Sequence, residues 1–220
     1  INTKNFVIMK TNEYNRNKAD NRIPLQFYDK IYKLLGNFKG DTQAVYFEKN
    51  SNNTLNLIVY NDDMGFSEND KEAYMVKNQS GDNSETAGVN GFGETLVIAR
   101  FLDRDKYASI YSLNKNENKY SKIYIGCYTH NPDGWGDMDK NDLNLFKKYV
   151  GLCLGKEPNE INLSGTLKII PIGYKENEDF HTEEGKNKIK NASIKYLHKK
   201  INNQNNFSFY WNGEIIKKIE

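Results

Sequence analysis

Apolar side chains follow two different periods along the chain, and each period predicts its own kind of element. Residues 24–37 ("PLQFYDKIYKLLGN") place apolar side chains three and four positions apart, which predicts a helix with one buried face. Two runs rich in β-branched and aromatic residues follow at 43–49 and 54–60, joined by an Asn-rich turn. The pattern therefore predicts a helix followed by a pair of strands.

The rest of the chain predicts further helices and strands. A short helix follows the turn at residues 61–66, and an apolar helix covers residues 94–101. The other predicted elements are a hairpin over 107–130, a helix over 140–153, a strand over 164–174, a helix over 191–201 and a hairpin over 206–219. The charged run at residues 175–188 is typical of a solvated surface loop.

This order of elements predicts the fold class. We expect an α+β, two-layer sandwich in which helices cover one face of a mixed, mostly antiparallel sheet. The 220 residues contain no internal repeat and no linker long enough to divide them. We therefore expect residues 1–220 to form a single domain.

Composition narrows the classes of function. The formal net charge is +2, so charge gives no indication of nucleic-acid binding. No apolar run reaches the length of a membrane span, and we expect an intracellular protein, cytoplasmic or nuclear, with reduced cysteines. The three histidines are scattered, and nothing in their spacing indicates a zinc site.

Three glycines stand at the start of the predicted helix over residues 94–101. Gly88, Gly91 and Gly93 follow a polar, Ser-rich run and lead directly into the apolar segment. Glycines before a helix N-terminus allow the backbone to approach a phosphate, because the first N–H groups of a helix are unpaired. An ordinary surface loop with a helix entry remains the alternative at this point.

Three stretches together resemble the motifs of the GHKL superfamily of ATP-binding domains, which includes type II topoisomerases, heat-shock chaperones, histidine kinases, MutL and the microrchidia ATPases. The resemblance is nearest to the microrchidia-like and type II topoisomerase domains, with degenerate motifs. "NDDMGF" at 61–66 resembles the Asp-x-Gly-x-Gly turn that holds adenine. "GVNGFG" at 88–93 resembles the glycine-rich end of the nucleotide lid, and "SGTLKII" at 164–170 resembles the later Gly-Thr strand. The resemblance covers nearly the whole chain and implies the Bergerat fold.

The resemblance also implies roles for particular residues. Asn61 or Asp62 corresponds to the group that accepts a hydrogen bond from adenine, with Gly65 in the same turn. Thr166 corresponds to the threonine that supports that group. The three glycines correspond to the phosphate-binding turn, and residues 67–90 to the mobile lid. ATP and Mg²⁺ are the implied ligands.

The first motif of the family departs from its usual form in this chain. The family places a catalytic Glu four residues before an Asn that binds magnesium. Asn37 matches that Asn, but Lys33 stands at the position of the general base. A lysine cannot act as that base unless its pKa is strongly lowered. The resemblance therefore implies nucleotide binding with weak or absent hydrolysis.

Three functions remain open from the sequence. The first is an ATP-binding domain that acts as a nucleotide-dependent conformational or dimerisation switch, alone or with further domains. The second is a degenerate, non-enzymatic interaction module that keeps the fold. The third is an unrelated α+β binding domain whose motifs match by chance.

Overall fold

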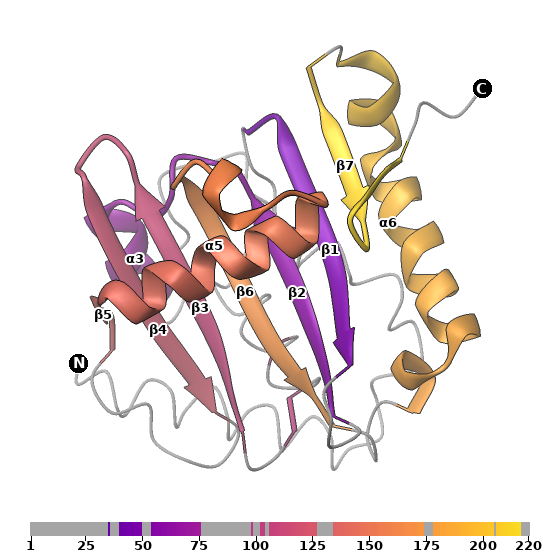
Figure 1. Ribbon diagram of the computed structural model, residues 1–220, viewed down its shortest axis with the longest axis horizontal. Helices are drawn as coiled ribbons and strands as arrows, with labels where there is room; N and C mark the ends of the chain where they lie inside the picture. Colours follow the sequence, from indigo (N-terminus) through magenta and orange to yellow (C-terminus); the bar gives the residue numbers. More distant parts are fainter. Residues whose placement is uncertain are drawn as a thin grey trace.

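The structure is a computed structural model, and it describes residues 35, 40–49, 54–75, 98, 102–103, 106–126, 134–173, 178–204 and 206–216. Its centre is an eight-stranded sheet with the strand order β5-β4-β3-β6-β2-β1-β7-β8. The helices α3, α5 and α6 pack on this sheet (Figure 1). The strands are β1 Thr42–Lys49, β2 Leu55–Asn61, β3 Tyr107–Asn114, β4 Lys119–Gly126, β5 Gly136–Asp137, β6 Gly165–Ile172, β7 Ser208–Trp211 and β8 Glu214–Ile216. The helices are α3 Glu68–Met75, α5 Lys140–Leu154 and α6 Glu183–Asn203, with short 3-10 turns η2 Pro158–Glu160 and η3 Glu178–His181.

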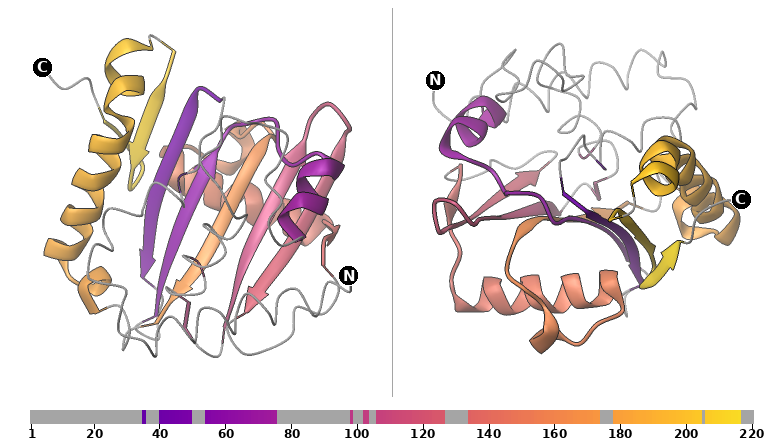
Figure 2. Two further views of the ribbon diagram at one scale, coloured as in Figure 1. Left: turned by 180° about the vertical axis from the view of Figure 1, so that it is seen from behind. Right: turned by 90° about the horizontal axis from the view of Figure 1, so that it is seen from above.

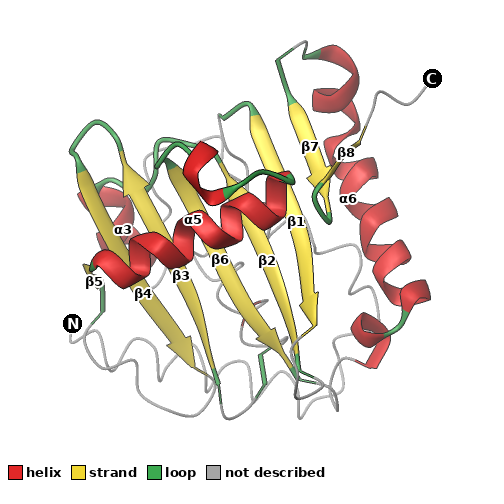
Figure 3. Cartoon of the chain, in the orientation of Figure 1, coloured by secondary structure: helices red, strands yellow, loops and turns green. Residues whose placement is uncertain are grey.

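The sheet is mixed and mostly antiparallel, as predicted, and the α+β class is confirmed (Figure 3). The pair β1 and β7 runs parallel, and the other six named strand pairs run antiparallel. The predicted strands at 54–60 and 164–174 lie side by side as β2 and β6. The hairpins β3–β4 and β7–β8 also match the predicted ones, with an Asn-containing turn in the first and the Asn212-Gly213 turn in the second.

The structure differs from the expectation in how the faces of the sheet are covered. The α5 helix packs on one face, whereas α3 and α6 lie on the other (Figure 2, right). Each face has its own apolar cluster: Phe146 and Val150 of α5 belong to one, and Leu197 of α6 belongs to the other. The physical reason lies in β2, where all seven residues are buried, so both of its faces need a covering layer.

The charged run at 175–188 is the second difference, since the expected loop contains the start of a helix. The α6 helix begins at Glu183, eight residues before the predicted helix over 191–201. Thr182 is its N-cap, and the Thr182 hydroxyl accepts a hydrogen bond from the Gly185 N–H at 3.0 Å. Two glutamates follow in the first turn, where negative charge is favourable. This local start signal outweighs the polar composition.

Two predicted helices fall largely outside the described residues. Of the helix predicted over 24–37, the structure describes Leu35, which is helical and fully buried. Of the helix predicted over 94–101, it describes Ile98, which is also helical and fully buried. Both side chains belong to the apolar cluster on the α6 face of the sheet.

Candidate functional site

The turn that follows β2 carries the carboxylate at the centre of the candidate site. The Asp63 side chain accepts two hydrogen bonds on the same oxygen, Oδ1. The Thr166 hydroxyl of β6 donates one at 3.0 Å, and the Gly65 N–H donates the other at 3.0 Å. The second oxygen, Oδ2, receives no hydrogen bond from the described residues. Within the described part of the chain, Asp63 is therefore fixed in orientation through one oxygen, and its second oxygen stays an acceptor.

The surroundings of Asp63 disfavour its charge. Burial is the largest influence and raises the pKa of the carboxyl above its ordinary value of 3.8. The bonds from Gly65 and Thr166 and the charge of Lys168 act in the opposite direction without cancelling it. A carboxylate whose pKa is raised within a fixed hydrogen-bond frame is a common feature of functional sites.

Gly65 permits the close approach of this turn to the sheet. Its φ is +73°, a conformation that side chains with a Cβ rarely adopt. A Cβ at this position would lie 2.6 Å from the Leu113 carbonyl oxygen of β3. The turn therefore lies directly against the backbone of β3.

The two residues before Asp63 have other partners. The Asp62 carboxylate accepts a hydrogen bond from the Thr42 N–H at 2.8 Å, and the Asp62 N–H donates to the Thr42 carbonyl at 3.1 Å. Asp62 thus closes the end of the β1–β2 pair. The Asn61 side chain is 3% exposed and donates through Nδ2 to the Leu35 carbonyl at 3.1 Å. Its Oδ1 is a buried acceptor without a partner.

A row of buried polar side chains crosses the sheet at the level of the site. Each member stands directly opposite the next on the neighbouring strand, and all are at most 5% exposed. The polar row consists of Gln43, Asn61, Thr166, Ser112 and Ser121. Its members hold successive parts of the chain that lie over the sheet: Leu35, Asp63, Phe66 and Lys71.

The α3 helix is anchored at the far end of the polar row. Lys71 is 6% exposed, and its ammonium donates to the Ser121 hydroxyl at 2.6 Å and to Glu68 at 2.9 Å. The Phe66, Tyr74 and Trp135 rings contact one another with centroids 5.1–5.9 Å apart. Residues 67–75 of the predicted lid thus include a helix with buried contacts, and residues 76–90 lie outside the described part.

Lys168 is an unusual neighbour of the site. It lies two residues after Thr166 on the same face of β6 and is only 3% exposed. Lysine is rarely so deeply buried unless its charge has a partner, and the Asp63 carboxyl is a charged group with which Lys168 interacts. Its charge lowers the pKa of Asp63, so the start of β6 carries both a cation and the hydroxyl that supports the carboxylate.

The structure brings together only part of the predicted site. Thr166 and Gly65 both contact Asp63, while Asn61 and Asp62 are bound to Leu35 and Thr42. Lys33, Asn37, Gly88, Gly91 and Gly93 lie outside the described residues.

Asp63, at the centre of the candidate site, is the residue that the sequence analysis did not select. The signal was present, because Asp63, Met64 and Gly65 form an Asp-x-Gly sequence. This places the first Asp of the motif at Asp63, two residues after Asn61. In that register Ser67 replaces the last Gly of the motif.

No cluster of three or more His, Cys, Asp or Glu side chains in the described ranges could hold a metal ion. The residue expected to bind Mg²⁺, Asn37, is not among them. Within the same ranges, no helix combines the length and the apolar character that crossing a bilayer requires.

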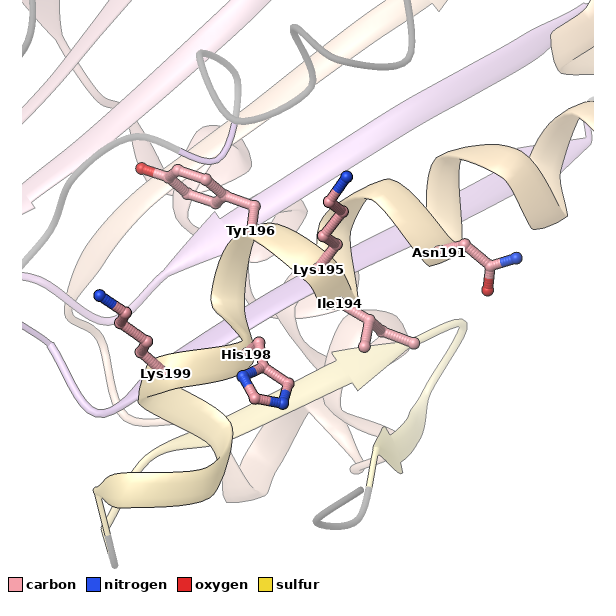
Figure 4. Close-up of a pocket in the computed structure, with 6 residues that line it drawn as sticks. All are labelled: Asn191, Ile194, Lys195, Tyr196, His198 and Lys199. Carbon is pink, nitrogen blue, oxygen red and sulfur yellow. The ribbon is translucent and has the colours of Figure 1, made fainter. Parts of the chain in front are cut away.

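An open pocket of about 500 Å³ lies elsewhere, along α6 (Figure 4). Its described lining residues all come from this helix: Asn191, Ile194, Lys195, Tyr196, His198 and Lys199. They offer cations and no carboxylate, and none belongs to the elements that carry Asp63 and Thr166. The pocket is therefore separate from the candidate site.

The sheet, the helices on its two faces and the supported carboxylate are consistent with the Bergerat fold that the sequence motifs resemble. The chain is similar to the MutL ATPase domain of Aquifex aeolicus complexed with ADP, with a TM-score of 0.48 and 12% identity. That match covers 90% of this chain and 64% of the MutL chain.

A second match is to the ATPase and transducer domains of DNA topoisomerase II from Balamuthia mandrillaris, with a TM-score of 0.49 and 13% identity. It covers 88% of this chain and 48% of that one. The ATPase region of Saccharomyces cerevisiae topoisomerase II matches with a TM-score of 0.43 and 11% identity, over 87% of this chain and 48% of that one.

No protein-family model and no curated protein sequence matches the chain. The chain spans less than two thirds of the solved structures described above. At this identity the likeness concerns the fold alone, and the roles of individual residues rest on the contacts around Asp63.

Proposed function

We propose that this chain is a nucleotide-binding module of the GHKL type and that Asp63 recognises the base. The observation that carries the proposal is the hydrogen bond from Thr166 to Asp63 Oδ1, which leaves Oδ2 as an oriented acceptor. The exocyclic amine of adenine is a donor that suits a single carboxylate oxygen. Guanine presents a carbonyl oxygen at the same place, and this would face Asp63 unfavourably.

The phosphates and Mg²⁺ would be held by residues outside the described ranges. Gly88, Gly91 and Gly93 are the proposed phosphate contacts, and Asn37 is the proposed magnesium ligand. Bound Mg²⁺ would neutralise phosphate charge. The module would act as a nucleotide-dependent conformational or dimerisation switch, with little hydrolysis of its own because Lys33 replaces the general base.

A degenerate interaction module is the second candidate, and Lys168 is the observation that favours it. A cation buried at 3% exposure beside the supporting threonine can occupy space that a flat, neutral base would need. In this case the polar row and the turn would persist as parts of the fold, without a ligand.

Calorimetric titration and thermal unfolding with ADP separate the two candidates. ADP at about a hundred times its Kd should add about 2.7 kcal/mol to the free energy of unfolding. GDP should bind at least about tenfold more weakly, because guanine carries a carbonyl oxygen where adenine carries its C6 amine. The absence of any ADP or ATP-analogue binding, with and without Mg²⁺, would reject the proposal and favour the interaction module.

Two variants test whether the base contact is at Asp63. Asp63→Asn replaces the charged acceptor by a neutral amide and should weaken ADP binding by about tenfold. Asp137→Asn is the matched control, because Asp137 is an exposed carboxylate on the edge strand β5. An equal effect of the two variants would mean that ADP, if bound, uses another site.

A further inference from the structure

The main chain of Phe66, which follows the candidate site, is held by two side chains of β3. The Ser112 hydroxyl accepts a hydrogen bond from the Phe66 N–H at 2.6 Å. The Asn114 amide nitrogen donates to the Phe66 carbonyl at 3.2 Å. Ser112 and Asn114 lie two residues apart on β3 and so point to the same face. Together they bind the backbone N–H and the carbonyl of a residue that belongs to no strand or helix.

These two hydrogen bonds, called here the clamp on Phe66, are connected to the Asp63 carboxylate through Gly65. Phe66 follows Gly65, whose N–H donates to Asp63 Oδ1. Gly65 is in turn wedged against the Leu113 backbone, between the two clamping side chains. Because Phe66 directly follows Gly65, holding the Phe66 backbone also restrains the position of the Gly65 N–H that donates to Asp63.

Ser112 also lies beside Thr166 in the sheet. The two residues are direct cross-strand partners in the β3–β6 pair. Thr166 donates directly to Asp63 Oδ1. Ser112 binds the N–H of Phe66, the residue after Gly65, and the Gly65 N–H donates to the same Oδ1. The carboxylate is thus oriented from both sides by neighbouring members of the polar row.

We propose that Ser112 and Asn114 are positioning residues for Asp63, fixing the turn so that Oδ2 faces the ligand. The part of this inference that concerns ligand affinity rests on the proposed function. The part that concerns the carboxylate does not, because it can be measured without a nucleotide. Asn114 is itself locked in place, since its Oδ1 accepts the N–H groups of Asn116 and Glu117 in the β3–β4 turn.

The polar row supplies a matched control for this idea. Ser121 stands directly opposite Ser112 on β4, and both are nearly fully buried, at 5% and 1% exposure. Each hydroxyl accepts one hydrogen bond of 2.6 Å, Ser112 from the Phe66 N–H and Ser121 from the Lys71 ammonium. Removing either hydroxyl takes the acceptor from a donor in the described contacts, but only Ser112 is connected to the turn of Asp63.

The experiment measures the pKa of Asp63 by carbon-detected NMR, assigned with Asp63→Asn, in wild type, Ser112→Ala and Ser121→Ala without nucleotide. The Gly65 N–H bond favours the ionised carboxylate, so loosening the turn should raise the pKa of Asp63 further in Ser112→Ala. Ser121→Ala should leave that pKa at its wild-type value. Ser112→Thr keeps a hydroxyl and should restore wild-type behaviour. Asn114→Ala should act in the same direction as Ser112→Ala and provides a second test if Ser112→Ala fails to fold.

ADP affinity is the second readout, and Ser112→Ala should weaken it by several-fold to about tenfold. An unchanged Asp63 pKa in both Ser112→Ala and Asn114→Ala would overturn the inference, as would equal effects of Ser112→Ala and Ser121→Ala. If the pKa shifts as expected but wild type binds no ADP, the positioning role stands and the proposed function fails.

Discussion

Thr166 and Asp63 are 103 residues apart in the chain, and the threonine hydroxyl donates to the carboxylate at 3.0 Å. Thr166 is 2% exposed on β6, and Asp63 follows the end of the neighbouring strand β2. This contact gives the candidate site its orientation, because it occupies one oxygen of Asp63 and leaves the other.

A double-mutant cycle should detect this contact directly. We expect Thr166→Val to lower the free energy of unfolding by about 1–2 kcal/mol, because it removes a donor from a half-buried carboxylate. In the Asp63→Asn background the same change should cost less. Urea unfolding of the four proteins gives the coupling energy, and strictly additive effects would show that the hydrogen bond contributes nothing.

The raised pKa of Asp63 predicts a particular pH dependence of stability. Between the ordinary value of 3.8 and the raised value, the folded protein binds more protons than the unfolded chain. The contribution of Asp63 to stability is therefore largest at low pH and declines as the pH rises through this window. Urea unfolding across the window should show this decline in wild type relative to Asp63→Asn. If the stability of wild type relative to Asp63→Asn instead increased with pH, this would contradict a raised pKa caused by burial of the carboxyl.

Gly65→Ala should be strongly destabilising. The new methyl group would lie 2.6 Å from the Leu113 carbonyl oxygen, at a φ of +73°. We expect a loss of about 1–3 kcal/mol from strain alone, measured by thermal or urea unfolding. Gly136→Ala is the control, because a Cβ at Gly136 would meet no atom within 4 Å, and its effect should stay within about 0.5 kcal/mol. Similar losses for the two variants would mean that the turn does not lie against β3.

Cys153 should be unreactive in the folded protein. It lies on the buried face of α5 and is fully buried, and burial raises the pKa of its thiol. In a Cys127→Ser background, a disulfide reagent such as DTNB should label Cys153 only as fast as the protein opens. Added urea should accelerate the labelling towards the rate of a free thiol. Rapid labelling in native buffer would contradict the packing of α5 on β2.

Hydrolysis of ATP by the isolated chain should be negligible, and Lys33→Glu alone should not restore it fully. A positioned general base contributes about a hundredfold to ten-thousandfold to such reactions, and Lys33 stands where the resemblance places that base. Phosphate release measured beside ATP-analogue binding, for wild type and Lys33→Glu, tests this. Robust Mg²⁺-dependent turnover by wild type would show that the alignment of the first motif is wrong.

The sequence by itself determined the elements whose signals are local. Period-two apolar runs with turn residues between them gave β1, β2, β6 and both hairpins, because alternate side chains of a strand point to opposite faces. Helical spacing gave α5 with nearly correct ends. The Thr-Glu-Glu start of α6 was also a local signal, but the polar composition of residues 175–188 outweighed it in the prediction. The covering of one face was predicted from the order of elements, and the burial of all seven β2 residues was decided by the tertiary structure.

The sequence predicted the region of the candidate site but not its central carboxylate. Gly65 and Thr166 were identified through the motif resemblance, and both contact the central carboxylate. Which acid stands between them was decided by the tertiary structure, since the period of two ends with β2 at Asn61. Beyond that point the direction of a side chain depends on how the turn is held, and here the clamp on Phe66 comes from β3, more than forty residues away. The pairing of Ser112 with Thr166 likewise follows from the strand order, which no local pattern fixes.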